Sequence, residues 1–433
     1  MQKALFAAGF AAALVVSTQL AIADRDDDRH DERENIQVGP RPFYLVDGMD
    51  DSALKSKLLS CKDEPVHRTN FSIGHRGAAL QFPEHTKESY QAAARMGAGI
   101  VECDVTFTGD GTLVCRHAQN DLATTTNILL TPLASTCIKP FTPATFDGSG
   151  HMLTPASAEC RTSELTVREF KSLRGKMDSF NPAARTPQEF QGGVPSWRTE
   201  VNTGRGTTMT MRESIELNER NGVKHTPELK EGDPAVIARV FGGQAQYAQR
   251  FADELRDAGV DPKDAVSQSF NVNDILYWIN HTHYGRQATF LVDYDDVANN
   301  ILLFDITGRQ LVSRAEQLAF FRQLRRAGVQ IVAPAMPALL GVNGNRVVPS
   351  PLAMDLKGMG YDIITWTFER ADLRGGASTA GFYYDFDPAG AAIKKDSDMY
   401  KALDVLARQV GILGIFSDWP ATVSYYASCL GLK

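Results

Sequence analysis

Residues 72–117 read SIGHRGAALQFPEHTKESYQAAARMGAGIVECDVTFTGDGTLVCRH, and this stretch decides the fold. Three short apolar runs within it each end in side chains that can carry chemistry, and a later run ends in the same way. These side chains are His75, Arg76, Glu102, Asp104, His117, Glu228 and Lys230. Polar groups at the ends of successive strands are typical of a barrel enzyme, whose site lies where the carboxyl ends of the strands meet.

The order of apolar and helical patterns predicts an α/β fold. Helical patterns such as 87–96, 247–258, 315–327 and 398–410 alternate with short apolar runs. The run 113–116 follows a Thr-Gly-Asp-Gly turn and is the return strand of a hairpin. The other runs are 71–74, 100–105, 223–229, 265–270, 288–292, 329–333, 362–368 and 413–417. Eight strand–helix units predict a parallel sheet closed into a (β/α)8 TIM barrel.

One long connection interrupts this rhythm, after the hairpin of the second barrel strand. Helical patterns at 163–174 and 211–221 are the ordered parts of it, and the rest is rich in proline and glycine. Long connections in compact domains are usually functional. We therefore expect an insertion at about 118–210. It either covers and shapes the barrel mouth or decorates the surface without a part in substrate choice, and the sequence leaves both readings open.

The first residues carry the pattern of a signal peptide at 1–23. Lys3 precedes an apolar run, and Ala21-Ile22-Ala23 is a small-x-small cleavage site. The charged segment 24–35 lacks apolar residues, so we expect a disordered arm, assigned to 24–45, and the barrel domain at 46–433. No other stretch is long and apolar enough to span a bilayer. These features predict an exported protein, periplasmic or extracellular, without stable membrane insertion after signal removal.

The charge balance disfavours nucleic acid as a partner. The formal net charge is −7 and no basic patch stands out, so polyanions would be repelled at long range. A phosphate-binding site in this chain must therefore be local.

Six cysteines in an exported chain predict disulfides. Cys137 and Cys160 bracket a loop-like part of the insertion, and a bond between them would close it. Cys61 precedes the first barrel strand and Cys429 follows the last. Because these strands are neighbours in a closed barrel, we favour this pair as well.

The remaining pair, Cys103 and Cys115, flanks the hairpin turn and raises a conflict of register. Direct pairing of these cysteines places His117 opposite Val101, on the face away from Glu102. Pairing His117 with Glu102 instead turns the two cysteines to opposite faces. We favour the second register, because the chemistry needs His117 near Glu102, and we doubt this third disulfide.

Glu102 and Asp104 are two residues apart on a predicted strand, so both point toward the barrel axis. Two close carboxylates repel each other, and a divalent cation removes this cost. Glu228 supplies a third oxygen donor, and an all-carboxylate set suits a hard ion, Ca2+ or Mg2+. The alternative is a pair of structural salt bridges, Glu102 with Arg76 and Glu228 with Lys230. Convergence of all these groups at one barrel mouth favours the metal.

The neighbouring cations and histidines fit phosphodiester chemistry. Arg76 offers a planar fork to two phosphate oxygens, and Lys230 a point charge. The unperturbed pKa of histidine is near neutrality, so His75 and His117 are the predicted acid and base. Three further residues at strand ends are predicted to line the pocket, although Trp366 could equally be core filler. They are Gln268, Phe270 and Trp366.

Other polar residues receive structural roles. We expect His281 and His283 in a surface loop and His225 packed in its strand. We expect Asp418 to do no more than cap the turn that follows the last strand.

Taken together, these motifs resemble the glycerophosphodiester phosphodiesterase family. The matching pieces are His75-Arg76-Gly77, Pro83-Glu84-His85-Thr86, Glu102-x-Asp104, the turn at 108–111, His117, Glu228-Leu229-Lys230, Trp366-Thr367 and 414–418. The sequence departs from the family at His85, where Asn is usual, and at Ala118, where Asp is usual. The resemblance implies a metal-dependent enzyme that cuts glycerophosphodiesters to glycerol 3-phosphate and an alcohol. It also implies that Trp366 packs against a glycerol-like moiety.

Two other functions compete with this interpretation. One is a related lipid phosphodiesterase of the phospholipase type, which the lack of an amphipathic membrane-facing stretch disfavours. The other is a non-catalytic barrel that binds phosphorylated ligands or glycans, which the presence of both His75 and His117 disfavours.

Overall fold

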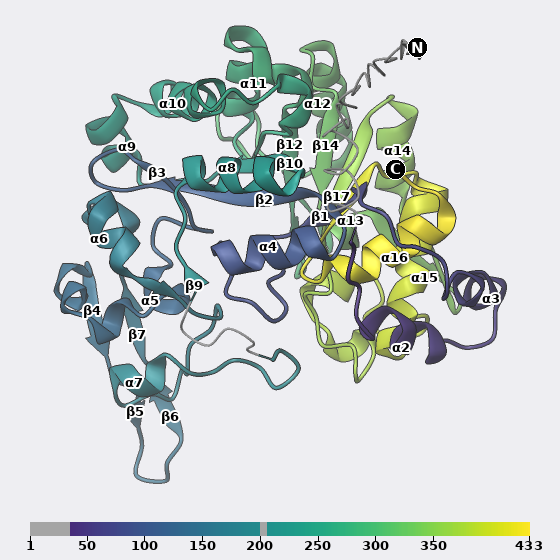
Figure 1. Ribbon diagram of the computed structural model, residues 1–433, viewed down its shortest axis with the longest axis horizontal. Helices are drawn as coiled ribbons and strands as arrows, with labels where there is room; N and C mark the ends of the chain where they lie inside the picture. Colours follow the sequence, from purple (N-terminus) through teal and green to yellow (C-terminus); the bar gives the residue numbers. More distant parts are fainter. Residues whose placement is uncertain (1–34, 200–205) are drawn as a thin grey trace, which may run out of the picture. The chain divides into compact units, whose positions relative to one another are not determined.

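Eight parallel strands close into a barrel in the computed structural model, which describes residues 35–199 and 206–433 (Figure 1). Strand β1 (Thr69–Gly74) pairs with β2 (Ala98–Phe107) on one side and with β18 (Gly414–Ser417) on the other, which closes the sheet. Between them lie β10 (Lys224–Leu229), β11 (Gln268–Ser269), β12 (Thr289–Asp295), β14 (Ile331–Pro334) and β17 (Asp362–Phe368). All eight predicted barrel strands are confirmed.

Helices surround this barrel, and several begin at side-chain caps that the sequence encodes. Thr210 and Ser313 each form a capping box, at the first turns of α8 and α12. The longer helices are α4 (Lys87–Arg95), α8 (Met211–Asn221), α9 (Pro234–Phe241), α10 (Gln244–Asp257), α11 (Val272–His281), α12 (Arg314–Arg326), α14 (Pro351–Gly358), α15 (Met399–Val405) and α16 (Pro420–Leu430). The four helical patterns predicted between barrel strands are all present within two or three residues, except that α15 ends in a π-helical turn at Leu406–Val410.

The barrel interior is a small apolar core of its own. Its buried members are Ile73, Ile100, Leu291, Ile331, Ala333, Ile364 and Phe416. Since alternate residues on a strand point the same way, Ile100 on β2 sets the direction for Glu102 and Asp104, which follow it toward the mouth. The apolar core therefore forms a floor beneath the polar side chains.

The hairpin after β2 differs from both registers considered above. Strand β3 (Leu113–Cys115) pairs antiparallel to β2 with Cys115 opposite Val105, and Arg116 N donates to Asp104 O at 2.8 Å. The Cys103–Cys115 disulfide that we doubted is formed, across a diagonal of the ladder. The predicted pairing of His117 with Glu102 was therefore wrong, because β3 is shifted by one residue along β2 relative to that register.

The insertion folds as a lobe beside the barrel, at the lower left of Figure 1. It contains α5 (Leu122–Thr125), α6 (Val167–Ser172), α7 (Pro187–Phe190) and two small hairpins, β4 (Lys139–Thr142) with β7 (Ser157–Glu159) and β5 (Thr145–Phe146) with β6 (Met152–Thr154). Leu122, Ile128, Phe170 and Phe190 belong to a hydrophobic core separate from that of the barrel. The Cys137–Cys160 disulfide lies within this lobe, as predicted.

The described chain begins on the other side of the barrel. Helices α2 (Arg41–Asp47) and α3 (Ala53–Ser60) lead to the predicted disulfide Cys61–Cys429. The range 24–45 assigned to the arm thus overlaps helix α2, whose Leu45 is buried. The predicted signal peptide and the first part of the arm lie outside the described residues.

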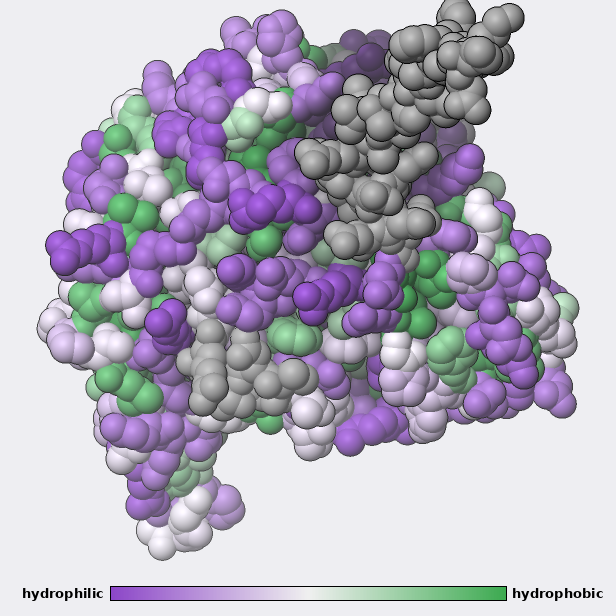
Figure 2. Space-filling view, in the orientation of Figure 1, coloured by the Kyte–Doolittle hydropathy of each residue, from purple (hydrophilic) through white to green (hydrophobic). Residues whose placement is uncertain are grey.

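The face in Figure 2 is largely hydrophilic, with small apolar patches scattered over it. Among the helices in residues 35–199 and 206–433, none is long and apolar enough to cross a membrane.

Candidate active site

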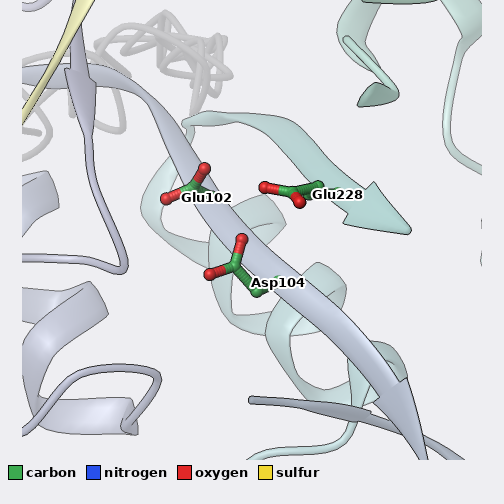
Figure 3. Close-up of side chains that lie close together, drawn as sticks. All are labelled: Glu102, Asp104 and Glu228. Atoms are coloured by element: carbon green, nitrogen blue, oxygen red, sulfur yellow. The ribbon is translucent and has the colours of Figure 1, made fainter. Parts of the chain in front are cut away.

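Three carboxylates converge at the carboxyl ends of two neighbouring strands. Glu102 and Asp104 lie on β2, and the parallel register places Glu228 of β10 directly opposite Asp104. One oxygen from each of the three lies within 4.8 Å of the other two, and all three side chains are buried (Figure 3). The sequence-predicted metal ligands are therefore brought together.

Neighbouring groups hold these acids in place but leave one oxygen free. Glu102 accepts hydrogen bonds from Gln268 Nε2 and from the Arg76 backbone N–H, each at 2.9 Å. Lys230 Nζ lies 2.7 Å from a Glu228 oxygen. Asp104 Oδ1 has no hydrogen-bond partner within the described part of the chain. Burying a carboxylate oxygen without a hydrogen-bond partner costs free energy. A cation bound beside Asp104 Oδ1 would supply the missing partner.

The electrostatics of the three acids favour a cation in the same way. Burial, together with Asp104 and Glu228, raises the pKa of Glu102 well above its ordinary value. Burial raises the pKa of Glu228 to about 8 against the pull of Lys230. Burial would also raise the pKa of Asp104, but Lys230 and His85 hold it well below its ordinary value. The residues present therefore fit a hard divalent cation.

His85 contributes to the candidate active site, although we predicted no role for it there. It departs from the family residue, and in the fold its Nε2 lies 2.9 Å from Asp104 Oδ2 while its Nδ1 lies 3.0 Å from the Tyr90 hydroxyl. It is fully buried. His85 thus orients one of the three acids from behind, as outer partners of metal-binding carboxylates do.

His75 is held by Asp418, which corrects the role that we gave this aspartate. Asp418 Oδ1 lies 2.5 Å from His75 Nδ1, so Asp418 does more than cap a turn. This contact directs His75 Nε2 toward Thr367 Oγ1 at 3.4 Å and Glu102 Oε2 at 3.8 Å. Burial and the Arg76 charge lower the pKa of His75 to about 4, against the opposing effect of Asp418. A carboxylate on Nδ1 fixes the tautomer and leaves Nε2 as the reactive nitrogen.

His117 lines the same cavity as His75. It follows the end of β3 and lines the cavity with Glu102, Asp104 and Glu228. Burial, with Arg76 and Lys230 nearby, lowers the pKa of His117 well below its ordinary value. Both predicted catalytic histidines therefore border the acid cluster.

Arg76 stands beside the cluster in a left-handed backbone conformation, with φ of +53°. Its Nη1 donates to Glu84 Oε2 at 2.8 Å, and its Nε lies 3.5 Å from Asp104 Oδ2. Lys230 Nζ lies over the Phe270 ring, 5.6 Å from its centre. Arg76 thus lies beside Asp104, and Lys230 beside Glu228.

The cavity itself has a volume of about 500 Å3 and one aromatic wall. Trp366 packs edge to face against Phe270 and stacks on Phe382, and its Nε1 donates to Ala333 O at 2.9 Å. Phe270 and Trp366 line the cavity as predicted. The prediction for Gln268 was wrong, because its side chain is fully buried and donates to Glu102 instead of facing the cavity. The sequence reading missed Phe382 and Tyr383, which come from the loop after β17 and carry no strand-end signal.

His225 is buried, as predicted, with its Nε2 2.8 Å from Glu219 Oε1. His281 and His283 are exposed, as predicted, but they do not lie in a loop. His281 is the last residue of α11, and His283 begins a 3-10 helix (His283–Gln287).

A closed parallel barrel with acids, cations and two histidines at the carboxyl ends of its strands defines a barrel hydrolase of the phosphodiesterase class. Comparison with protein families agrees, since the model of the glycerophosphoryl diester phosphodiesterase family matches residues 75–422. The chain belongs to this family and is an enzyme of it.

Individual proteins resemble the chain over different parts. An extracellular protein of Arthroderma benhamiae is 39% identical over 261 residues, which are 59% of this chain and 100% of the relative. A glycerophosphodiester phosphodiesterase of Arabidopsis thaliana is 22% identical over 89% of this chain and 91% of its own. An Oleispira antarctica phosphodiesterase, solved in complex with the product sn-glycerol-3-phosphate, is 16% identical with a TM-score of 0.48, over 82% of this chain and 95% of its own.

Proposed function

We propose that this protein hydrolyses glycerophosphodiesters to glycerol 3-phosphate and an alcohol, with one divalent cation, Ca2+ or Mg2+. Glu102, Asp104 and Glu228 would hold the cation. The observation that carries the proposal is the meeting of three buried carboxylates with two histidines and two cations around one cavity. Membership of the glycerophosphoryl diester phosphodiesterase family supports the substrate class.

The phosphate would lie between the acid cluster and the two cations. Arg76 and Lys230 both line the cavity, so each would bind a phosphate oxygen. The bound cation would offset the charge of the three carboxylates and stabilise negative charge that develops on the phosphate. Trp366 and Phe270 supply an apolar surface for the carbon chain of the glycerol unit.

The nucleophile is the second part of the proposal. No Ser or Cys adjoins a histidine in the matching motifs, so covalent catalysis by a side chain has no candidate. The glycerol hydroxyl beside the ester can attack phosphorus instead, and held geometry contributes about 7 kcal/mol or more in favourable cases. The P–O bond to the alcohol breaks, and a cyclic phosphate forms that water opens in a second step.

His75 and His117 would act as acid and base and exchange these roles between the two steps. In the first step one histidine removes the proton of the attacking hydroxyl and the other donates a proton to the leaving alcohol oxygen. In the second step the roles reverse, so that both return to their starting states. His75 would act through Nε2, because its Nδ1 faces Asp418.

Two assays test the proposal. A panel of water-soluble glycerophosphodiesters, measured with and without chelator, should show metal-dependent release of glycerol 3-phosphate. An analogue without the neighbouring hydroxyl should bind but turn over far more slowly. Turnover equal to that of the parent substrate, with no cyclic species trapped early, would show that water attacks directly.

Export to the periplasm or outside the cell is also part of the proposal. Three disulfides, Cys61–Cys429, Cys103–Cys115 and Cys137–Cys160, support an oxidising compartment. An extracellular relative supports the same location. Fractionation of cells that produce the full chain tests it, and retention of the protein in the cytosol would contradict it.

A further inference from the structure

We propose that Asp178, which lies in the insertion, is a positioning residue for His75 and acts through Arg370 and Asp418. The inference rests on the proposed catalytic role of His75. It assigns the insertion a part in the active site, in place of the two readings that the sequence left open.

A continuous line of hydrogen bonds joins these four side chains. Asp418 uses one carboxylate oxygen for His75 Nδ1, at 2.5 Å, and the other accepts from Arg370 Nη1 at 2.9 Å. Arg370 Nη2 in turn donates to Asp178 Oδ2 at 2.6 Å. The guanidinium of Arg370 is therefore held from two sides, by one acid of the barrel and one acid of the insertion.

Asp178 is itself fixed to the barrel. Its Oδ1 accepts from Arg198 Nη2 at 2.6 Å, and the same nitrogen donates to the Ala79 carbonyl oxygen, in the loop after β1. Arg198 also belongs to the insertion, and only 6% of its side chain is exposed. The insertion thus anchors Asp178 against the loop that begins with His75 and Arg76.

A second branch leads from Arg370 to the proposed phosphate site. Arg370 Nη2 lies 3.6 Å from Glu84 Oε2, the same oxygen that accepts from Arg76 Nη1. The guanidinium of Arg370 therefore borders both the acid that holds His75 and the acid that holds Arg76.

The physical reason lies in the geometry of the guanidinium. Its donors are fixed in one plane, so two carboxylates on different N–H groups determine how that plane lies. The side chains of Arg370 and Asp178 are 16% and 17% exposed, and that of Asp418 is fully buried. Loss of the Asp178 charge leaves Arg370 with an unbalanced, partly buried charge and one fixed contact fewer. Asp418, and with it the His75 ring, is then held less firmly.

The first experiment is the substitution Asp178→Asn, which keeps the shape and removes the charge. We expect kcat to fall roughly tenfold, because small misplacements of catalytic groups have effects of this order or larger. We expect KM and the metal affinity to stay near the parent values, and the melting temperature to fall, because Arg370 and Arg198 lose a charged partner. Asp147→Asn is the matched control. Asp147 belongs to the same insertion, and in the described part of the chain its side chain has hydrogen-bond or ion-pair partners only in Ser149 and His151. This control should behave like the parent.

A second readout is independent of turnover. The 15N NMR signals of the His75 ring report which nitrogen carries the proton, and a His75→Gln spectrum assigns them. In the parent we expect protonated Nδ1, and in Asp178→Asn a mixture of tautomers. Arg370→Lys keeps the charge without the fork, so it should give the same loss of kcat and the same mixture.

The outcomes separate this inference from the proposed function. Parent-like kcat in both Asp178→Asn and Arg370→Lys, or unchanged His75 signals in both, overturns the inference. An equal loss in Asp147→Asn also overturns it, since the effect would not be specific. If Asp178→Asn does not fold, Arg370→Lys decides alone. If the parent cleaves no glycerophosphodiester, the proposed function fails, and the NMR comparison still tests the link between Asp178 and His75.

Discussion

Glu228 on β10 and Asp104 on β2 face each other directly in a parallel register. Two residues earlier on each strand, Thr226 lies opposite Glu102. The position of Glu228 relative to the other two acids is therefore fixed by backbone pairing, and only the side-chain rotamers remain adjustable. Such a preformed set of donors is what selective metal binding requires.

Glu228→Gln should weaken metal binding without loss of the fold. The amide keeps the size of the side chain but removes a charged donor, so we expect at least about tenfold weaker binding and loss of most activity. Calorimetric titration with Ca2+ and Mg2+ measures this, with Glu216→Gln on the exposed face of α8 as control. A variant that binds metal like the parent would mean that Glu228 serves only as the partner of Lys230.

Removal of the metal should abolish activity and lower the melting temperature, because a ligand that binds only the folded state stabilises it. Readdition of Ca2+ or Mg2+ should restore both properties. Thermal unfolding with chelator and with each ion measures the stability change, and the hydrolysis assay measures the activity. Full activity of a metal-free sample would refute the metal assignment.

Asp418→Asn should lower kcat by about 100-fold or more with little change in KM. An asparagine can donate a hydrogen bond to Nδ1 and so favour the wrong His75 tautomer, an effect that is large in histidine–aspartate pairs of hydrolases. Steady-state kinetics on a glycerophosphodiester measures it. Parent-like kcat would show that Asp418 does not orient a catalytic histidine.

The buried Asp274 should make stability depend on pH. It accepts hydrogen bonds from Gln244 Nε2 and Ser269 Oγ, and burial raises its pKa to about 6. Because the unfolded value is about 4, the stability that Asp274 contributes at low pH is lost as the pH rises through 6. Urea unfolding of the parent and of Asp274→Asn at pH 4 and 7.5 should show the variant gaining stability relative to the parent at the higher pH. An equal difference in the free energy of unfolding between parent and variant at pH 4 and at pH 7.5 would contradict this prediction.

Peptide mapping of non-reduced protein should find Cys137 linked to Cys160. The bond closes a lobe whose own hydrophobic core is small, so its reduction should expose the lobe to protease before the barrel. Limited proteolysis with and without reductant tests the second point. A free thiol at either position in protein isolated from the periplasm or the medium would contradict the pairing.

The sequence predicts those parts of the site that depend on local periodicity. Glu102 and Asp104 follow from the two-residue repeat of a strand, and the eight barrel strands follow from alternating patterns. The hairpin register could not be predicted, because Cys103, Cys115 and His117 allow several ladders that differ by one step. In the structure Cys115 lies opposite Val105, and this pairing defines the register of the hairpin.

The missed residues share a different physical cause. Asp418, Arg370 and Asp178 are joined only through the fold, across as many as 192 positions of sequence. A charged residue has the same local signature on a solvated loop as in a buried ion pair, so no pattern separates the two. His85 is similar, since its contact with Asp104 depends on the left-handed turn that it adopts, with φ of +54°.

The tie between the two ends of the barrel domain has a practical meaning for handling the protein. Thr69, at the start of β1, donates its hydroxyl to the Leu432 carbonyl oxygen, and the Cys61–Cys429 bond lies close by in sequence. The chain therefore leaves the barrel beside the amino ends of its strands, whereas the acids and histidines lie at the carboxyl ends. An affinity tag or a surface linker joined to Lys433 would hold the molecule with the mouth of its cavity pointing into solution.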